Sequence, residues 1–201
     1  MPVFAASNSG KTSEVIKLFS DLEAKGHHHR YGLTAAGGSK LESVSDKCYV
    51  LSCGPESAVA ATKSVIEQAL FYQAMLEHAC GIPLLARQSK ALSEQMQSAL
   101  TATIDPGLID KIAAAPTVYF AGRNDGVAEE LTLKTNEITR KKSDFLEGTY
   151  AVHGIEEVMN ADDVVIWIDP YEDSLTKFND VLVKGVGLTV ITVSTRPTTF
   201  P

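Results

Sequence analysis

The sequence lacks several features that would point to particular classes of function. No apolar run approaches the roughly 20 residues of a membrane-spanning helix, and no basic and apolar signal pattern follows Met1. Basic residues are not in excess either, because 18 lysines and arginines stand against 25 aspartates and glutamates, for a net charge of -7. Nucleic acids bind basic surfaces, so this balance argues against a nucleic acid as the main partner. We expect a cytoplasmic protein that binds a small molecule.

Cysteine is also scarce. Cys48, Cys53 and Cys80 are odd in number and lack the spacing of a zinc site, so we expect reduced and mostly buried thiols. Three histidines at 27–29 follow Gly26, where a solvated turn at a helix end is favoured over a metal site. The sequence therefore predicts no metal and no cofactor.

What the sequence does contain is an alternation of short apolar segments and helical patterns, which is typical of α/β proteins. Helical periodicity covers 13–23 and 57–78. The segments expected to form buried parallel strands are 3–6, 31–34, 48–51, 118–121, 164–168 and 188–193. Because the strand signal vanishes between about 83 and 115, we predict two domains, 1–105 and 106–201, with a duplicated strand, loop and helix pattern.

The most informative stretch is "FAASNSGKTSE", which joins the first predicted strand to the first helix. At such a junction the free N–H groups and the dipole of the helix favour an anion. Ser7, Ser9 and Thr12 would add hydroxyl donors and Asn8 an amide, so a phosphate monoester could be held there by neutral hydrogen bonds. The same residue types also form ordinary turns and helix caps, and this alternative is about as well supported by the loop alone.

A nucleotide-binding P-loop is a second interpretation of this stretch. "AASNSGKT" fits the loosest form of that motif, with Ala5 in place of its first glycine. "VVIWID" at 164–169 could supply the magnesium-binding carboxylate, Asp169, that such proteins need. The missing glycine would crowd the phosphate, so the P-loop ranks second.

A family resemblance favours the sugar-phosphate interpretation. "SNSGKT" resembles the phosphate loop of SIS (sugar isomerase) domains, and "GPESAVAATKSVIEQ" at 54–68 resembles a segment of the double-SIS isomerase domain of the glucosamine-fructose-6-phosphate aminotransferase family. "AGRNDGVAEELTLKTNEI" at 121–138 and "EGTYAVHGIEE" at 147–157 continue the match in the same order. The resemblance implies two flavodoxin-like, doubly wound SIS subdomains.

The resemblance also implies roles for individual residues. Glu137 matches the carboxylate that moves a proton between C1 and C2 of the sugar, and His153 matches the histidine that helps to open the ring. The residues implied to bind the substrate are Ser7, Asn8, Ser9 and Thr12 at its phosphate, and Val59, Ala61 and Glu130 elsewhere. Asn8 replaces the usual glutamine, Ala61 replaces a typical serine, and Glu130 precedes Glu137 by seven residues, on the same helix face.

These residue types suit aldose–ketose interconversion on chemical grounds. The reaction needs a base for the α-proton and donors for the enediolate. A glutamate is ionised at neutral pH, and a histidine can pass a proton to the ring oxygen. For each residue alone, a solvent-facing carboxylate or a packed ring is the simpler explanation, and only the matched order and spacing favour function.

Two departures from the family shape the expected activity. The sequence opens almost directly at the family's second loop, without the first strand and its "GTS"-type loop, and the C-terminal tail that carries a lysine in some members would have to follow Pro201. The chain thus resembles a shortened protein without a glutaminase domain, and we expect a phosphosugar isomerase or deaminase, or else a non-catalytic SIS binding module. By the same resemblance we expect a homodimer whose site combines Glu137 of one chain with His153 of the other.

Overall fold

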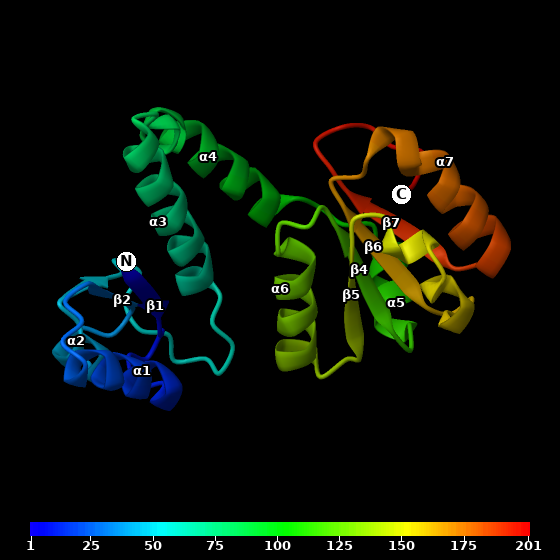
Figure 1. Ribbon diagram of the computed structural model, residues 1–201. Coiled ribbons are helices and arrows are strands. Elements are labelled where there is room, and N and C mark those ends of the chain that lie inside the picture. Colours follow the sequence, from blue (N-terminus) through cyan, green and yellow to red (C-terminus); the bar gives the residue numbers. More distant parts are fainter. The chain divides into compact units, whose positions relative to one another are not determined.

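A computed structural model describes the whole chain, Met1–Pro201. The chain consists of two compact units, Met1–Thr101 and Ala102–Pro201. Each unit is built on a parallel sheet with helices on its faces (Figure 1). This arrangement confirms the predicted α/β class. None of the helices is both long and apolar enough to cross a bilayer.

The first unit has three parallel strands in the order β1-β2-β3. Their bounds are β1 (Val3–Ala6), β2 (Arg30–Thr34) and β3 (Lys47–Val50). The helices are α1 (Ser13–Ala24), α2 (Lys40–Val44), α3 (Lys63–Cys80) and α4 (Leu84–Thr101). The register pairs Val3 with Arg30 and Tyr31 with Lys47, so the carboxyl ends of all three strands lie at one edge.

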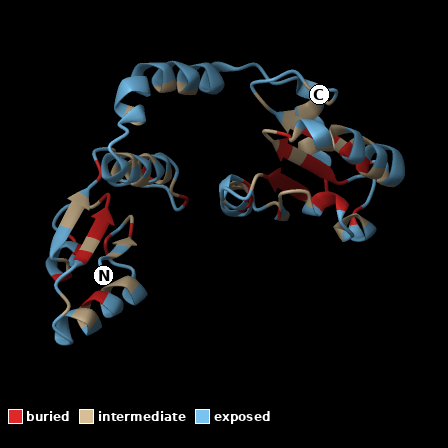
Figure 2. Ribbon diagram, turned by 45° about the horizontal axis from the view of Figure 1, so that its top comes forward, coloured by how far each residue is buried: buried red, intermediate tan, exposed pale blue.

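Alternate residues of this sheet pack against helices on its two faces. Phe19 of α1 and Leu41 of α2 are fully buried on one face, with Val3 and Ala5 of β1 packed against their cluster. Leu33 and residues of α3, including Phe71, share a second cluster on the other face. Figure 2 shows the buried residues gathered at the sheet, whereas α4 has no buried residue. The sheet and α1 therefore form a packed support for the loop between them.

The second unit has four parallel strands in the order β5-β4-β6-β7. The strands are β4 (Val118–Gly122), β5 (Ser143–Glu147), β6 (Val164–Ile168) and β7 (Thr189–Val193). The main helices are α5 (Pro106–Ala114), α6 (Val127–Lys134) with a π-helical turn η1 (Thr135–Thr139), and α7 (Leu175–Phe178) with a π-helix η5 (Asn179–Val186). Short 3-10 helices are η2 (Tyr150–Val152), η3 (Ile155–Val158) and η4 (Glu172–Ser174).

The central strand β4 is buried along its whole length. Its residues Tyr119 and Ala121 join a cluster with Trp167 and Phe178, whereas Val118 and Phe120 join another that includes α5 and α6. A strand with both faces covered reads as a continuous apolar run, which is why its sequence predicts it so clearly. The chain leaves β4 toward β5 on one side, and β6 lies on the other side. The sheet is therefore doubly wound.

Three predictions about local structure were wrong. Strand β5 was missed, since its sequence "SDFLE" buries only Leu146 and lies at the edge of the sheet. The helix expected to begin at 57 begins at Lys63, because the preceding residues form a loop. The cysteines are not mostly buried: Cys48 and Cys53 are half-buried and Cys80 is exposed, although all three are free thiols.

Candidate functional site

The first part of the candidate site is the loop of residues 7–12, which joins β1 to α1. Ser7 extends the strand, because its N–H donates to the carbonyl of Leu33 at 2.9 Å, and only 5% of the residue is exposed. The Ser7 and Thr12 hydroxyl oxygens lie 2.7 Å apart, and the Thr12 N–H points to Ser7 Oγ at 3.4 Å. The loop thus brings two hydroxyl groups together at the first turn of α1.

Gly10 allows the loop to turn this tightly. Its φ is +62°, and its N–H donates to the Ser7 carbonyl at 3.0 Å. A Cβ on Gly10 would lie 2.2 Å from Ser39 Oγ, so a larger residue would clash with the segment after β2. The glycine in "SNSGKT" is therefore required both by its backbone conformation and by the close approach of Ser39.

The N-terminus of α1 has no side-chain cap. Thr12 occupies the N-cap position but makes no capping hydrogen bond, and its hydroxyl pairs with Ser7 instead. The first N–H groups of an α-helix have no intrahelical partner, and they carry the positive end of the helix dipole. The 7–12 loop therefore presents N–H groups and hydroxyls to an anion.

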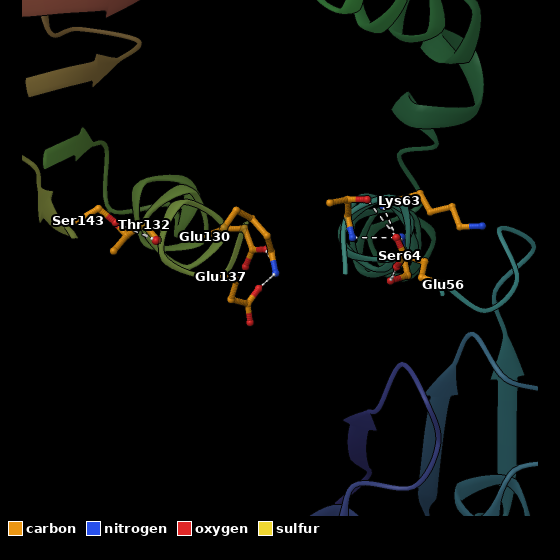
Figure 3. Close-up of polar contacts among 9 residues, drawn as sticks. Glu56, Lys63, Ser64, Glu130, Thr132, Glu137 and Ser143 are labelled. Carbon is orange, nitrogen blue, oxygen red and sulfur yellow. Dashed lines mark hydrogen bonds and ion pairs between the residues drawn. The ribbon is translucent and has the colours of Figure 1, made fainter. Parts of the chain in front are cut away.

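The N-terminus of α3, in contrast, is occupied by Glu56. Its carboxylate accepts hydrogen bonds from the N–H groups of Thr62 (2.9 Å) and Lys63 (3.1 Å) and from the Ser64 hydroxyl (Figure 3). Hydrogen bonds from the Ser64 hydroxyl, first, and from the Thr62 N–H lower the pKa of Glu56 from 4.5 to about 2. The protein thus supplies the anion at α3 itself.

The remaining predicted phosphate ligands are placed differently from one another. Ser9 is exposed, and its hydroxyl accepts a hydrogen bond from the Lys11 N–H at 3.3 Å. The side-chain oxygen of Asn8 is buried and has no hydrogen-bond partner, while the Asn8 carbonyl accepts from Thr34 Oγ1 and from the Ala35 N–H. The structure brings Ser7, Ser9 and Thr12 together at the helix end, and it turns the Asn8 amide oxygen inward.

Val59 and Ala61 lie in the loop before α3. The Val59 side chain is fully exposed, Ala61 is half-buried, and it is Ala60 between them that packs inward. The role of Val59 and Ala61 at a sugar stays a prediction from the resemblance.

The second part of the candidate site is a group of charged side chains at the end of α6. Lys134 Nζ lies 2.8 Å from Glu137 Oε2 and 3.3 Å from Glu130 Oε1. Figure 3 shows Glu130 and Glu137 on the same side of the helix, as their spacing predicts. Burial acts to lower the pKa of Lys134, but the hydrogen bond to Glu137 and the charge of Glu130 outweigh it, so this pKa is raised. Lys134 is therefore a firmly charged partner for both carboxylates.

Sequence reasoning missed Lys134. The signal was present, because a residue three positions before Glu137 must lie on the same helix face. The position of Glu137 is further fixed by its neighbour Asn136, whose side-chain oxygen accepts a hydrogen bond from the Ser143 N–H at 3.0 Å. This bond ties the π-helical turn to the first residue of β5.

The structure does not bring His153 and Glu137 together within the second unit. Glu137 follows α6 and lies where β5 begins, at the amino edge of the sheet. His153 lies beyond the carboxyl end of β5, is exposed, and has its Nε2 3.5 Å from Lys177 Nζ. The length of a five-residue strand, roughly 16 Å, separates the two edges.

The geometry also removes the second support for a P-loop. Asp169 follows β6, whereas the 7–12 loop follows β1, and these strands belong to different sheets in different units. The Asp169 carboxylate is already paired with Arg123 at 3.0 Å and with Arg196 at 2.8 Å. It is not the free carboxylate beside the loop strand that a magnesium-nucleotide site needs.

Comparison with known proteins agrees with the resemblance found in the sequence. No family model matches the chain. The isomerizing glutamine–fructose-6-phosphate aminotransferase of Clostridium perfringens is 27% identical over 202 residues, which cover 92% of this chain and 33% of that enzyme. The chain is similar in sequence to the isomerase part of such aminotransferases. It spans about a third of their length.

Solved structures show the same fold. The C-terminal domain of the Francisella tularensis glucosamine-fructose-6-phosphate aminotransferase matches with a TM-score of 0.74 and 20% identity, over 94% of this chain and 57% of that one. A Thermotoga maritima glucosamine-6-phosphate deaminase matches with a TM-score of 0.73 and 21% identity, over 96% of this chain and 60% of the other. The chain has the fold of SIS phosphosugar isomerases.

Proposed function

We propose that this chain binds a hexose or hexosamine 6-phosphate at the 7–12 loop and moves a proton between C1 and C2 of the sugar, as a phosphosugar isomerase or deaminase. The single observation that carries the proposal is the uncapped N-terminus of α1 with the Ser7 and Thr12 hydroxyls beside it. The relatives support the substrate class, because their names describe enzymes of fructose 6-phosphate and glucosamine 6-phosphate. As part of this proposal, the protein acts in the cytoplasm without a cofactor.

A phosphate group suits this loop for electrostatic reasons. The chain carries a net charge of -7, so binding an anion depends on a local arrangement rather than on the overall field. A helix N-terminus stabilises a nearby negative charge by about 0.3–1 kcal/mol at an exposed site. Each hydrogen bond to the charged phosphate adds about 1.5–3 kcal/mol. Two hydroxyls and the helix N–H groups therefore favour a phosphate at this loop despite the negative net charge of the chain.

Glu137 is the proposed base. An ionised carboxylate can take the α-proton of an open-chain sugar and return it to the neighbouring carbon. Lys134 holds this carboxylate at 2.8 Å and is itself held by Glu130, so the base is positioned by a cation that has a second carboxylate partner. The carboxylate is still about one third exposed, so it can accept a proton from a ligand.

The proposal assigns ring opening to His153 of a second copy. Because His153 and Glu137 lie at opposite edges of the second sheet, one unit does not supply both groups to the same sugar. A two-fold dimer can exchange such residues between its two sites. We therefore propose a homodimer with shared sites.

Incorporation of solvent deuterium tests the reaction directly. The chain is incubated in heavy water with fructose 6-phosphate or glucosamine 6-phosphate, and deuterium at C1 and C2 is measured by NMR. We expect exchange with the unaltered chain and none with Glu137→Gln, while phosphosugars raise the melting temperature of both proteins. Undiminished exchange by Glu137→Gln would reject the assignment of the base.

A non-catalytic phosphosugar-binding module is the second candidate. The separation of Glu137 from His153 favours it, because it asks for no partner residue at the site. A phosphosugar would then raise the melting temperature with no deuterium exchange in either protein. Stabilisation by ATP with magnesium, without stabilisation by any phosphosugar, would contradict both candidates.

A further inference from the structure

A cleft at the β7 end of the second sheet takes no part in the proposed function. Its volume is about 300 Å³, at the lower end of the range for small-molecule sites. It lies between the segment that follows β6 and the segment that follows β7, so it opens at the carboxyl edge of the sheet. The first segment lines it with Pro170, Glu172 and Leu175, and the second with Ser194, Arg196, Pro197 and Thr198.

Contacts within the unit hold both walls of the cleft in place. The Asp169 N–H donates to the Val193 carbonyl at 2.8 Å, which joins the two segments where they leave the sheet. The Thr198 hydroxyl lies 2.7 Å from the Thr192 hydroxyl, and Phe200 packs against the buried core of the unit. The segment after β7 therefore folds back on the sheet, and the cleft is formed before any ligand arrives.

The positive group of the cleft is the Arg196 guanidinium. The Asp169 carboxylate pairs with Arg196 at 2.8 Å and with Arg123 at 3.0 Å, so two cations share one negative charge. Arg196 uses a single nitrogen, Nη2, for both Asp169 and the Pro170 carbonyl, and its Nη1 and Nε groups have no hydrogen-bond partner in the chain. Half of the side chain is exposed. Arg196 can therefore donate charge-assisted hydrogen bonds to the carboxylate of a ligand.

The other lining groups supply a negative charge and an apolar wall. The Glu172 carboxylate is exposed, and no cation of the chain pairs with it. Leu175 is half-buried against the core of the unit, and Pro197 faces it across the cleft lining. A carboxylate, an ammonium group and a hydrocarbon side chain together are the three parts of an apolar amino acid. Inorganic phosphate, in contrast, would use Arg196 and meet the like charge of Glu172 in the same cleft.

We propose that this cleft binds an α-amino acid with an apolar side chain. The carboxylate of the ligand would pair with Arg196 and its ammonium group with Glu172, while its side chain would contact Leu175 and Pro197. The proposal does not rest on the proposed function, because the cleft contains none of the groups assigned to the sugar phosphate or to proton transfer.

Amide NMR spectra of the full chain test this site. The labelled protein is titrated separately with leucine, with isocaproate, which lacks the ammonium group, and with isopentylamine, which lacks the carboxylate. We expect leucine to shift amides within 171–175 and 194–198, and each analogue to bind roughly threefold or more weakly, because each loses one ion pair.

Absence of these shifts with leucine, or equal affinity for leucine and either analogue, would overturn the proposal. Inorganic phosphate that shifts the same amides as strongly as leucine would identify an anion site and overturn it too. None of these outcomes bears on the phosphosugar proposal, which concerns amides within 7–13.

Substitutions make the test specific. Glu172→Gln alters an exposed side chain and should weaken leucine binding roughly two- to fivefold, without weakening the binding of isocaproate. Arg196→Gln removes the charged donor and should weaken leucine binding about tenfold or more. Asp173→Asn is the matched control, because Asp173 is an exposed carboxylate of the same turn that does not line the cleft.

An equal loss of leucine affinity in Glu172→Gln and Asp173→Asn, or no loss in Glu172→Gln, would contradict the site. The spectra themselves report whether each variant is folded. Glu172→Gln decides the case even if Arg196→Gln disturbs its segment, because Glu172 makes no contact that holds the walls together.

Discussion

Replacing Thr12 by valine should weaken phosphosugar binding far more than it weakens the fold. Valine keeps the shape of threonine and removes the hydroxyl, which in the free protein is paired only with Ser7 at 2.7 Å. A hydrogen bond to a charged phosphate contributes about 1.5–3 kcal/mol, whereas a partly exposed pair of neutral hydroxyls contributes about 1 kcal/mol or less. Because 1.4 kcal/mol is about tenfold in affinity, Thr12→Val should raise the dissociation constant by roughly 10- to 100-fold.

Calorimetric titration with glucose 6-phosphate and with inorganic phosphate measures this effect. Thr101→Val is the matched control, because the Thr101 hydroxyl bonds only to carbonyl groups of its own helix, with Gln97 at 2.9 Å. We expect Thr101→Val to bind as the unaltered chain does, and both variants to unfold at similar urea concentrations. Unchanged affinity of Thr12→Val for both ligands would refute the reasoning, and an equal loss in both variants would show that the effect is not local.

Three further predictions concern the remaining parts of the site and its support. Lys134→Met should reduce deuterium exchange about tenfold or more, because Glu137 then loses the cation that holds it. The affinity for phosphate should stay unchanged. Full exchange by this variant would show that Lys134 does not position the base. Mixing inactive Glu137→Gln and His153→Ala chains should restore roughly a quarter of normal exchange if sites are shared. About half of the randomly formed dimers are then mixed, and each mixed dimer has one intact site out of two. No recovery of exchange would contradict shared sites. The folded-state pKa of Glu56 is lowered to about 2, so this residue stabilises the chain above pH 4.5 and ceases to do so as the pH falls toward 2. Glu56→Gln should therefore lower the urea midpoint near neutral pH and have little effect near pH 2, and a constant difference across this range would argue against the cap.

The parts of the fold that the sequence predicted well are those with buried strands. Val164–Ile168 and Val118–Gly122 are central strands covered on both faces, so their apolar runs are unambiguous. Ser143–Glu147 pairs on only one side and buries one residue, so its sequence carries almost no strand signal. Edge strands are defined by the neighbour they pair with, which lies elsewhere in the chain.

The start of α3 could not be read from its sequence for a related reason. Residues 57–62 have the composition of a helix, yet the chain stays in a loop until Lys63 because the Glu56 carboxylate reaches forward to the N–H groups of Thr62 and Lys63. The candidate site, too, could be predicted only in part from the local sequence. The spacing of Glu130 and Glu137 predicted a shared helix face, but the sequence could not show that His153 lies at the other edge of the sheet.

The contrast between α1 and α3 explains why one helix end is a candidate anion site and the other is not. Both helices begin after a loop that follows a strand, and both have a threonine at the N-cap without a side-chain capping bond. At α3 the protein's own carboxylate, Glu56, occupies the free N–H groups, so an external phosphate would have to displace a charge that is already well bound. At α1 the Ser7 and Thr12 hydroxyls lie beside the helix end, and Glu14, the acidic residue of the first turn, does not cap it. Anion binding at the 7–12 loop therefore depends on the absence of a carboxylate from the loop as much as on the presence of serine and threonine. A carboxylate placed in this loop by Ser9→Asp should abolish phosphate binding by repulsion.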